Sequence, residues 1–404
     1  MQNTEVLVSG AGIAGPALAY WLRRAGFAVT IVERAPAPRP GGQTVDLRGA
    51  GRTVIERMDL MGRARAESMD QRGFALVDAS GRTTSRIPAD SFGGEGIVSE
   101  IEILRGDLAR LLHEATLPDT EYLFDDTVTG LTQHADGVTA TFEKAPRRRF
   151  GLVIGADGPH SVVRALAFGP EREFVRPLGL YTAWFTATEA LDLDGWYLMH
   201  NAPGGLVASA RPGRLPGEIK AGFSFRSAPI AYDRRDIAAQ RELVARRFAH
   251  VGWEAPRLLR AMHTASDFFF DTMGQVRLDH WSRGRVALLG DAGYCATPLT
   301  GLGTSLALVG AYVLAGELAL AGGDHHIAFR RYDEVMRPYV SQAQQLPPGG
   351  VSGYAPSGSL GIRLRDLSMR SMTRWPMRNL LAAQFAKARD IALPDYGLAT
   401  PGAR

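Results

Sequence analysis

The sequence contains very little cysteine and very little lysine. One of its 404 residues is cysteine, Cys295, so an internal disulfide and a multi-cysteine metal site are both excluded. Lysine occurs only at positions 144, 220 and 387, and all other basic residues apart from histidine are arginines. The 46 basic and 42 acidic residues nearly balance, and no polybasic block occurs. Composition therefore provides no argument for binding nucleic acid or an anionic membrane.

Long apolar segments and targeting signals are also scarce. The most apolar stretch, 302–321, contains Glu317 and several glycines, and it falls short of a membrane span of about 20 apolar residues. The first residues lack the basic and apolar regions of a signal peptide. With 45% hydrophobic and 22% charged residues, the chain has the composition of a globular protein of two or three domains. We therefore expect a cytoplasmic monomer or dimer that binds no nucleic acid, membrane or metal.

Apolar runs and glycine clusters predict a parallel βαβ unit at the start of the chain. Residues 5–9 form an apolar run that ends at glycines, residues 14–25 have helical spacing, and residues 28–33 form a second apolar run. Short aromatic-rich runs between 176 and 228 alternate with glycine and proline turns, which predicts an antiparallel sheet. Helices are expected at 52–67, 106–115, 235–250, 254–263, 304–320, 324–345 and 360–392, with a loop at 345–359.

These elements predict an α/β fold made of a Rossmann-like domain, an inserted antiparallel β-sheet domain and a C-terminal helix. The Rossmann-like domain is expected to be discontinuous, with the antiparallel sheet inserted into it as a second domain. The assignment is 1–72, 98–175 and 267–345 for the Rossmann-like domain, 73–97 and 176–266 for the inserted domain, and 346–404 for the C-terminal segment. Apolar residues within 364–385 give that segment an apolar face, which we expect to cover the core or a gate.

The glycine string Gly10-Ala-Gly12-Ile-Ala-Gly15 lies between a predicted strand and a predicted helix. Gly10 permits a tight turn, Gly12 lets the backbone approach a pyrophosphate, and Gly15 lets helix and strand pack closely. The N-terminus of the helix presents unpaired N–H groups to the phosphates. Glu33 follows the third glycine by 18 residues and can accept hydrogen bonds from a ribose. The motif in this setting predicts a dinucleotide site.

Two further glycine-marked turns follow predicted buried strands. The stretch from Gly155 to Arg164 (GADGPHSVVR) follows the strand at 150–154, and the stretch from Gly290 to Gly303 (GDAGYCATPLTGLG) follows the strand at 285–289. Each places an aspartate beside glycines at the carboxyl end of a strand, where α/β sheets bind ligands. Either turn alone could be purely structural, but the three turns in this order are far more informative.

The three turns in this order resemble those of the single-component flavoprotein aromatic hydroxylases, the class A enzymes similar to p-hydroxybenzoate hydroxylase. The resemblance covers residues 4 to about 345 and is closest to the tetracycline-inactivating flavin monooxygenases. The stretches that carry this closer resemblance are 41–49, 102–108, 221–227, 267–271, 290–295 and 310–318. It implies FAD held in an extended form in the Rossmann-like domain and substrate above the flavin on the antiparallel sheet. It also implies NADPH or NADH as co-substrate, without a separate nicotinamide-binding fold.

The resemblance also implies roles for particular residues. Asp291 would hydrogen-bond the ribityl chain of FAD, and Arg105 would contact the ribityl or phosphate region. The turn at 301–303 would face the N1/O2 end of the flavin, where the dipole of the following helix stabilises the anionic reduced ring. Asp157 and Arg164 belong to a motif linked to both FAD and NADPH. The full set of expected cofactor contacts is Gly10, Gly12, Ile13, Ala14, Gly15, Glu33, Arg34, Arg48, Arg105, Asp157, Arg164, Asp291, Pro298, Gly301, Leu302 and Gly303.

Side chains on the predicted substrate sheet are the candidates for contacting substrate. They are Arg211, Phe223, Phe225 and Arg226. Strand alternation places both phenylalanines on one face, where they serve either to stack on substrate or to pack the core. No catalytic side chain is assigned, because the flavin performs the chemistry.

Three other residues have reactive side chains, and each has a structural alternative. His160 and His200 are candidates for assisting proton transfer, although a lone histidine is more often structural. We expect Cys295, which follows the third turn, to pack and not to act as a nucleophile.

The resemblance implies an NAD(P)H-dependent monooxygenase. Reduced FAD would react with O₂, and a flavin C4a-hydroperoxide would insert one oxygen atom into a polycyclic phenol or enol, by hydroxylation or Baeyer–Villiger insertion. A tetracycline-type antibiotic or an aromatic polyketide is the expected kind of substrate, in resistance or in biosynthesis. The alternative is a flavin-binding, drug-sequestering protein, or a reductase or NADPH oxidase on the same fold. Leu302 keeps that alternative open, because it replaces the glutamine usual in the family.

Overall fold

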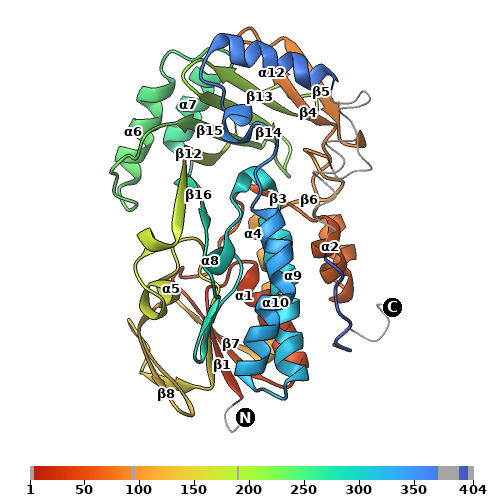
Figure 1. Ribbon diagram of the computed structural model, residues 1–404. Coiled ribbons are helices and arrows are strands. Elements are labelled where there is room, and N and C mark those ends of the chain that lie inside the picture. Colours follow the sequence, from red (N-terminus) through yellow and green to blue (C-terminus); the bar gives the residue numbers. More distant parts are fainter. Residues whose placement is uncertain (1–3, 92–95, 189–190, 372–390, 399–404) are drawn as a thin grey trace.

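The computed structural model describes residues 4–91, 96–188, 191–371 and 391–398, and it contains two large sheets, one above the other in Figure 1. The lower sheet has six strands in the order β17-β18-β11-β1-β2-β7, and the upper sheet has seven in the order β16-β12-β15-β14-β13-β4-β5. The predicted α/β class is confirmed. Expected strand positions at the N-terminus are also correct, because β1 is Glu5–Ser9 and β2 is Ala28–Glu33.

The six-stranded sheet is parallel except for its short edge strand β17, and it positions the three glycine turns. Val8 pairs with Ile31 of β2 and with Ile154 of β11, and all three side chains are buried. Its remaining strands are β7 (Thr120–Phe124), β11 (Leu152–Gly155), β17 (Ser282–Arg283) and β18 (Val286–Leu288). Helices around it are α1 (Ala14–Arg24), α4 (Arg105–Glu114), α5 (Val162–Ala167), α8 (Asp291–Tyr294), α9 (Gly303–Leu320) and α10 (His325–Ala343).

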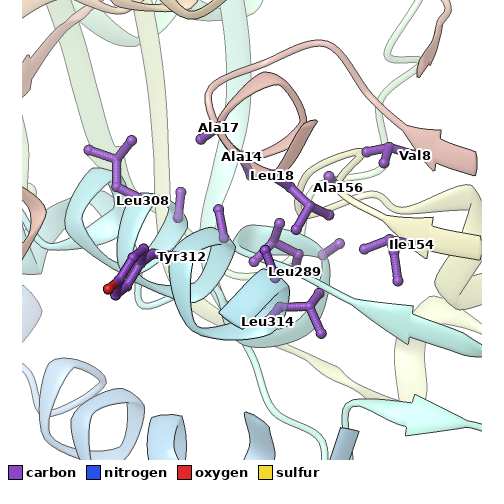
Figure 2. Packing of buried hydrophobic residues seen from close by; sticks show 14 of the residues in the cluster. Val8, Ala14, Ala17, Leu18, Ile154, Ala156, Leu289, Leu308, Tyr312 and Leu314 are labelled. Atoms are coloured by element: carbon purple, nitrogen blue, oxygen red, sulfur yellow. The ribbon is translucent and has the colours of Figure 1, made fainter. Parts of the chain in front are cut away.

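Helix α9 packs between α1 and α10 at the centre of the larger core. Leu18 of α1, Leu289 after β18 and Leu314 of α9 lie close together in Figure 2, and Leu308 of α9 belongs to the same core. Contrary to the expectation for 302–321, α9 is long and apolar enough to cross a membrane, but 78% of this apolar stretch is buried inside the molecule. Its hydrophobicity on all sides is therefore the signature of a central core helix.

The seven-stranded sheet is mixed, because its strand β4 runs parallel to β13 while all its other pairs are antiparallel. Its strands are β4 (Gly73–Val77), β5 (Thr83–Pro88), β12 (Val175–Ala187), β13 (Trp196–Ala202), β14 (Leu206–Pro212), β15 (Ile219–Arg226) and β16 (Phe269–Val276). Helices α6 (Ile237–Phe248) and α7 (Ala255–Thr264) close one face. Strand β16 corrects the expected boundary at 267, because residues 269–276 pair with β12 in this sheet.

Smaller elements join the two sheets. Strands β3 (Thr44–Asp46) and β6 (Glu102–Leu104) form a two-stranded ladder between the halves, and β8 (Val128–His134), β9 (Gly137–Phe142) and β10 (Arg148–Phe150) form a three-stranded sheet. The helix expected at 52–67 is two helices, α2 (Gly49–Arg57) and α3 (Met61–Ala66). They are separate because Asp59 adopts a left-handed φ of 57°, which ends α2.

The C-terminal part of the chain touches both halves. The stretch expected to be a loop at 345–359 contains α11 (Gly350–Tyr354), and α12 (Ser359–Ser371) starts the expected terminal helix, of which residues 372–390 lie outside the described residues. Residues 391–398 return to the lower half beside α2 (Figure 1), where the Tyr396 hydroxyl donates to Glu317 Oε1 at 2.7 Å.

Candidate FAD and substrate site

The first glycine turn is held by contacts that leave no room for a side chain. Gly10 has a φ of +108°, and a Cβ atom there would lie 2.5 Å from the carbonyl oxygen of Ala156. A Cβ at Gly15 would lie 2.0 Å from the carbonyl oxygen of Gly10. Only glycine lets α1 approach the strand this closely and lets the first turn touch the second. Ile13 and Ala14 follow as the start of α1, so their backbone N–H groups lie at its N-terminus.

Glu33 braces this turn from the end of β2. Its carboxylate accepts hydrogen bonds from the N–H of Ala11 and the N–H of Ala35, each at 2.8 Å. A carboxylate has about four acceptor positions, so these two bonds leave room for a ribose hydroxyl. Arg34 beside it is exposed. The predicted ribose contact of Glu33 and the predicted FAD contact of Arg34 stay predictions.

Asp157 and Arg164 hold the second turn against the third. Asp157 accepts from the Ser161 hydroxyl and from the N–H groups of Val162, at 2.8 Å, and Val163, at 3.2 Å. Arg164 is buried and donates to the carbonyl oxygens of Ala292 at 2.9 Å and Pro159 at 2.6 Å. These contacts give both side chains a structural role, and their direct contact with FAD or NADPH stays a prediction.

The third turn ends at the N-terminus of α9. Pro298 begins a single 3₁₀ turn, Gly301 closes it with a left-handed φ of 66°, and α9 starts at Gly303. Leu302 is only 4% exposed and belongs to the large apolar core. Leu302 therefore packs inward, and its predicted contact with FAD, like those of Pro298, Gly301 and Gly303, stays a prediction.

An ion pair lies directly beside the Gly301 turn. A Cβ at Gly301 would lie 3.4 Å from Asp46 Oδ2, which forms a 2.6 Å ion pair with Arg48. Arg48 is 4% exposed and also donates to the carbonyl oxygen of Gly96 at 3.0 Å. The predicted FAD contact of Arg48 stays a prediction, and the structure places its guanidinium group close to the turn expected to face the flavin.

Arg105 and Asp291 provide a test of whether these turns suit FAD. Arg105 Nη2 lies 3.5 Å from where a Cβ at Gly12 would be, and among the described residues it forms no hydrogen bond or ion pair. Burial and the nearby Arg39 lower the pKa of Arg105, while Glu33 and Asp291 oppose this. Burial also raises the pKa of the Asp291 carboxyl, against the favourable charge of Arg105. A free guanidinium group over a glycine turn suits an anionic, dinucleotide-sized group, so the residues fit FAD.

An apolar cluster occupies the space between the seven-stranded sheet and the third turn. We call this the inner cluster, and its face of the sheet, opposite α6 and α7, the inner face. The cluster comprises Phe74, Leu76, Ile87, Val98, Leu180, Met199, Val207, Met273, Ala355 and Met369, with Ile97, Ala89, Trp184, Tyr197, Leu299, Val351 and Tyr354 packed against it. Because Leu299 belongs to the third turn and packs against the inner cluster, the inner face lies next to the expected position of the flavin.

Phe223 and Phe225 lie on the wrong face to contact a substrate there. Both are fully buried, and their rings pack beside Phe248 of α6, with ring centroids 4.5 Å and 6.4 Å away. The sequence correctly predicts that they share a face, but that face is the one closed by α6 and α7. Their expected contact with substrate is therefore corrected to core packing.

Arg211 and Arg226 make protein contacts on the inner side. Arg211 forms an ion pair with buried Glu102 and donates to Gln71 Oε1 at 2.8 Å. Arg226 donates to the hydroxyl of Ser357 at 2.8 Å and so ties β15 to the C-terminal segment. Contact of either arginine with substrate stays a prediction.

Glu102 was not predicted as a functional residue. It is 2% exposed, and burial raises its pKa to about 8, against the favourable charge of Arg211, with Asp46 adding to the rise. The sequence shows an acidic residue in a short apolar strand, Glu102–Leu104, and this pattern could have indicated a buried carboxyl. The buried carboxyl of Glu102 therefore lies at the junction between the two sheets, beside Asp46, Arg48 and Arg211.

His160 bridges two carboxylates from different segments. Its Nδ1 lies 3.0 Å from Glu171 Oε2 and its Nε2 lies 2.7 Å from Asp271 Oδ2 on β16. Tyr232 also donates to Asp271, and Arg234 to Glu171. Burial opposes the charged form of His160, but these carboxylates outweigh it and raise its pKa to about 9.

His200 and Cys295 are both buried and have structural contacts. His200 Nδ1 lies 3.0 Å from the carbonyl oxygen of Val77. Cys295 lies 3.7 Å from the carbonyl oxygen of Gly274, and burial raises the pKa of its thiol, which disfavours the nucleophilic thiolate. The packing role expected for Cys295 agrees with this environment.

Comparison with known proteins assigns these turns to a family. The chain matches the FAD binding domain family over residues 3–345 and belongs to it. It is 38% identical to a flavin-dependent monooxygenase of Legionella longbeachae over 346 residues, which covers 85% of this chain and 88% of that protein. It is 46% identical to an uncharacterised Mycobacterium tuberculosis protein over 355 residues, which covers 87% and 94%. The chain is thus an FAD-dependent monooxygenase.

A solved structure refines the relationship. The crystal structure of tetracycline destructase Tet(51) superposes with a TM-score of 0.81 at 34% identity, covering 97% of this chain and 98% of that one. The predicted resemblance to class A flavin monooxygenases, close to the tetracycline destructases, is confirmed.

Proposed function

We propose that this protein uses NADPH or NADH and O₂ to insert one oxygen atom into a polycyclic phenol or enol, such as a tetracycline-type or aromatic polyketide compound. The observation that carries the proposal is the position of the inner cluster. Its apolar side chains meet the third turn at Leu299, so a hydrophobic ring system on the inner face would lie next to the expected flavin ring. The similarity to Tet(51), a tetracycline destructase, supports a substrate of this size and kind.

The chain contributes position, charge and the exclusion of water. Bound FAD supplies the chemistry that activates O₂ and transfers oxygen. The first turn and Arg105 would hold the phosphates, Asp291 would bind the ribityl chain, and the N-terminus of α9 would stabilise negative charge on the flavin. The inner cluster would keep water away from the reacting atoms and hold the substrate in one orientation.

The assignment of function to the two halves is part of this proposal. The segments 1–72, 98–175 and the chain after β16 to residue 345 would bind FAD, and 73–97 with 176–276 would bind substrate. We propose that the protein works in the cytoplasm, where NADPH and O₂ are both available.

The test is a substrate-dependent turnover assay. Purified protein loaded with FAD is mixed with NADPH and, separately, a tetracycline, a rifamycin and an anthraquinone. We expect at least one compound to accelerate NADPH oxidation and to yield a product heavier by one oxygen atom. NADPH oxidation that no compound changes, with peroxide as the sole product, would refute the proposal.

A second candidate function is ligand sequestration with NADPH oxidase activity. Leu302 favours it, because its inward packing leaves the turn beside the expected flavin ring without a polar side chain. Replacement of Leu302 by Gln separates the two functions. If oxygen insertion is already efficient in the natural chain, L302Q changes the ratio of product to peroxide little. A large rise in that ratio would identify the natural chain as an oxidase.

A further inference from the structure

Two stacked aromatic rings lie at the edge of the inner face. Trp184 of β12 and Phe269 of β16 are register partners, with ring centroids 5.8 Å apart and ring planes within 9° of parallel. Trp184 is half-buried and packs against the inner cluster, whereas Phe269 is 45% exposed. The pair therefore extends the inner cluster to an open edge with two parallel, stacked aromatic rings.

A glycine makes room for the indole ring to lie on the sheet. Gly222 of β15 is the register partner of both Trp184 and Ser209. A Cβ atom at this position would lie 3.1 Å from Trp184 Cδ1 and 2.9 Å from Ser209 Oγ. Glycine weakens the interior of a strand and often marks a site where another group approaches closely. Its presence in a central strand here is explained by the space that Trp184 requires.

The polar groups around the pair are satisfied, with one exception. In the next row of the sheet, Lys220 forms an ion pair with Glu218 at 2.7 Å and donates to Thr186 Oγ1 at 2.8 Å. Asp267 accepts from the N–H of Thr186 at 2.8 Å. By contrast, the indole N–H of Trp184 donates to none of the residues that the structure describes. The surface therefore offers a π-face and one hydrogen-bond donor, and its charges are already paired.

We propose that Trp184 and Phe269 form a stacking platform that selects planar, fused-ring substrates with a carbonyl or phenol oxygen at one edge. The inference deepens the proposed function and rests on it for the identity of the ligand as a substrate. Parallel ring pairs favour a further ring in an offset stack, and an indole N–H favours an oxygen acceptor. A charged aliphatic ligand would gain little here, because the nearby charges are already paired and an aliphatic chain cannot stack on the aromatic rings.

The experiment measures binding of a planar probe to the FAD-loaded protein. The probe is 1,8-dihydroxyanthraquinone, and its dissociation constant is measured by equilibrium dialysis for the natural chain and for variants. We expect Trp184→Leu to weaken binding about 10-fold, since aromatic stacking is lost, and Trp184→Phe to weaken it about 3-fold, since a smaller ring still stacks but the N–H and part of the ring area are lost. Phe269→Leu should weaken binding about 3-fold as well.

Controls separate binding from folding. Trp253→Phe makes the same chemical change on the side of the sheet covered by α6 and α7, where Trp253 packs against their cluster, and it should leave probe binding unchanged. FAD content and melting temperature should be unchanged in Trp184→Phe and Phe269→Leu. Phenol, with a single ring, should lose less than about twofold in affinity in Trp184→Leu.

The outcomes distinguish this inference from the proposed function. Equal probe affinity in the natural chain and in folded, FAD-loaded Trp184→Leu would overturn the platform, as would failure of the natural chain to bind the probe. If oxygen insertion proceeds with an unchanged KM for a planar substrate in Trp184→Leu, the platform is wrong and the proposed function stands. If Trp184→Leu weakens probe binding but the natural chain inserts no oxygen, the platform stands and the proposed function fails.

Discussion

The two large sheets of this protein present their expected ligands with different parts of the polypeptide. The six-stranded sheet is buried on both faces and offers strand ends, glycine turns and the N-termini of helices. The seven-stranded sheet closes one face with α6 and α7 and offers the side chains of the other. The half expected to bind FAD therefore depends on close backbone contacts, which a single added methyl group would disrupt. The half expected to bind substrate depends on which side of a strand each residue occupies.

The largest expected effect is on stability, and it comes from replacing Phe223, which lies on the face of the upper sheet covered by α6 and α7. Phe223→Ala should lower the free energy of unfolding by about 3–5 kcal/mol, because it leaves a cavity next to Phe248. The KM for substrate in the surviving folded protein should not change, because this ring faces α6. Denaturant unfolding and steady-state kinetics measure the two effects. A raised KM without loss of stability would show that Phe223 contacts substrate, and would contradict its role in core packing.

The next effect tests the close backbone contacts of the lower sheet. Gly15→Ala should cost about 3 kcal/mol of stability, because its Cβ would overlap the carbonyl oxygen of Gly10. Gly12→Ala is the matched variant, since its Cβ would meet only Arg105 Nη2, at an ordinary 3.5 Å. We expect it to keep the stability of the FAD-free protein and to lose FAD affinity. Equal stability in both alanine variants would contradict the role assigned to Gly15.

A smaller effect is expected at Asp291. Asp291→Ala should weaken FAD binding by about 1.5–3 kcal/mol, or about 10- to 150-fold, through loss of a charge-assisted hydrogen bond. Fluorescence titration of the FAD-free protein measures this affinity. Asp157→Ala serves as the comparison, because its carboxylate is occupied by Ser161 and two backbone N–H groups. Asp157→Ala should lower the free energy of unfolding and change the affinity for FAD little. A variant at Asp291 with unchanged affinity for FAD would refute its assignment.

The smallest effect concerns the link between the sheets at His160. Its pKa is raised from an ordinary 6.5 to about 9, so its contribution to stability is complete below about pH 6.5 and is lost as the pH rises through about 9. The melting temperature of the natural protein should therefore fall between these values more than that of His160→Gln. Arg234, Arg164 and Tyr232 face the same carboxylates. Burial raises the pKa of Tyr232 to about 12, and although burial acts against it, Glu171 raises the pKa of Arg234. If the melting temperatures of the natural protein and of His160→Gln changed with pH in the same way, His160 would carry no charge in the folded protein.

Much of the lower half could be predicted from the sequence because its determinants are local. A glycine string between an apolar strand and a helix predicts one turn geometry, and Gly10 and Gly15 adopt it. The break at Asp59 within the predicted helix 52–67 carries no proline or glycine at that position, so periodicity alone could not reveal it.

The upper half was harder to predict because its determinants are not local. Alternation shows that Phe223 and Phe225 share a face, but the choice of face depends on where α6 and α7 pack. The assignment of β16 depends on its pairing with β12, which lies about 90 residues earlier in the chain. The ion pair of Glu102 with Arg211 likewise joins two segments that only the fold brings together.

The origin of the inserted oxygen atom tests the central claim most directly. Turnover of an accepted polycyclic substrate under ¹⁸O₂ should yield a product that carries one ¹⁸O atom, with one NADPH consumed per product, and the label should be absent when H₂¹⁸O replaces ¹⁸O₂. Label from water, or NADPH consumption that ends entirely in peroxide, would contradict the claim that FAD at these turns oxygenates a ligand on the inner face.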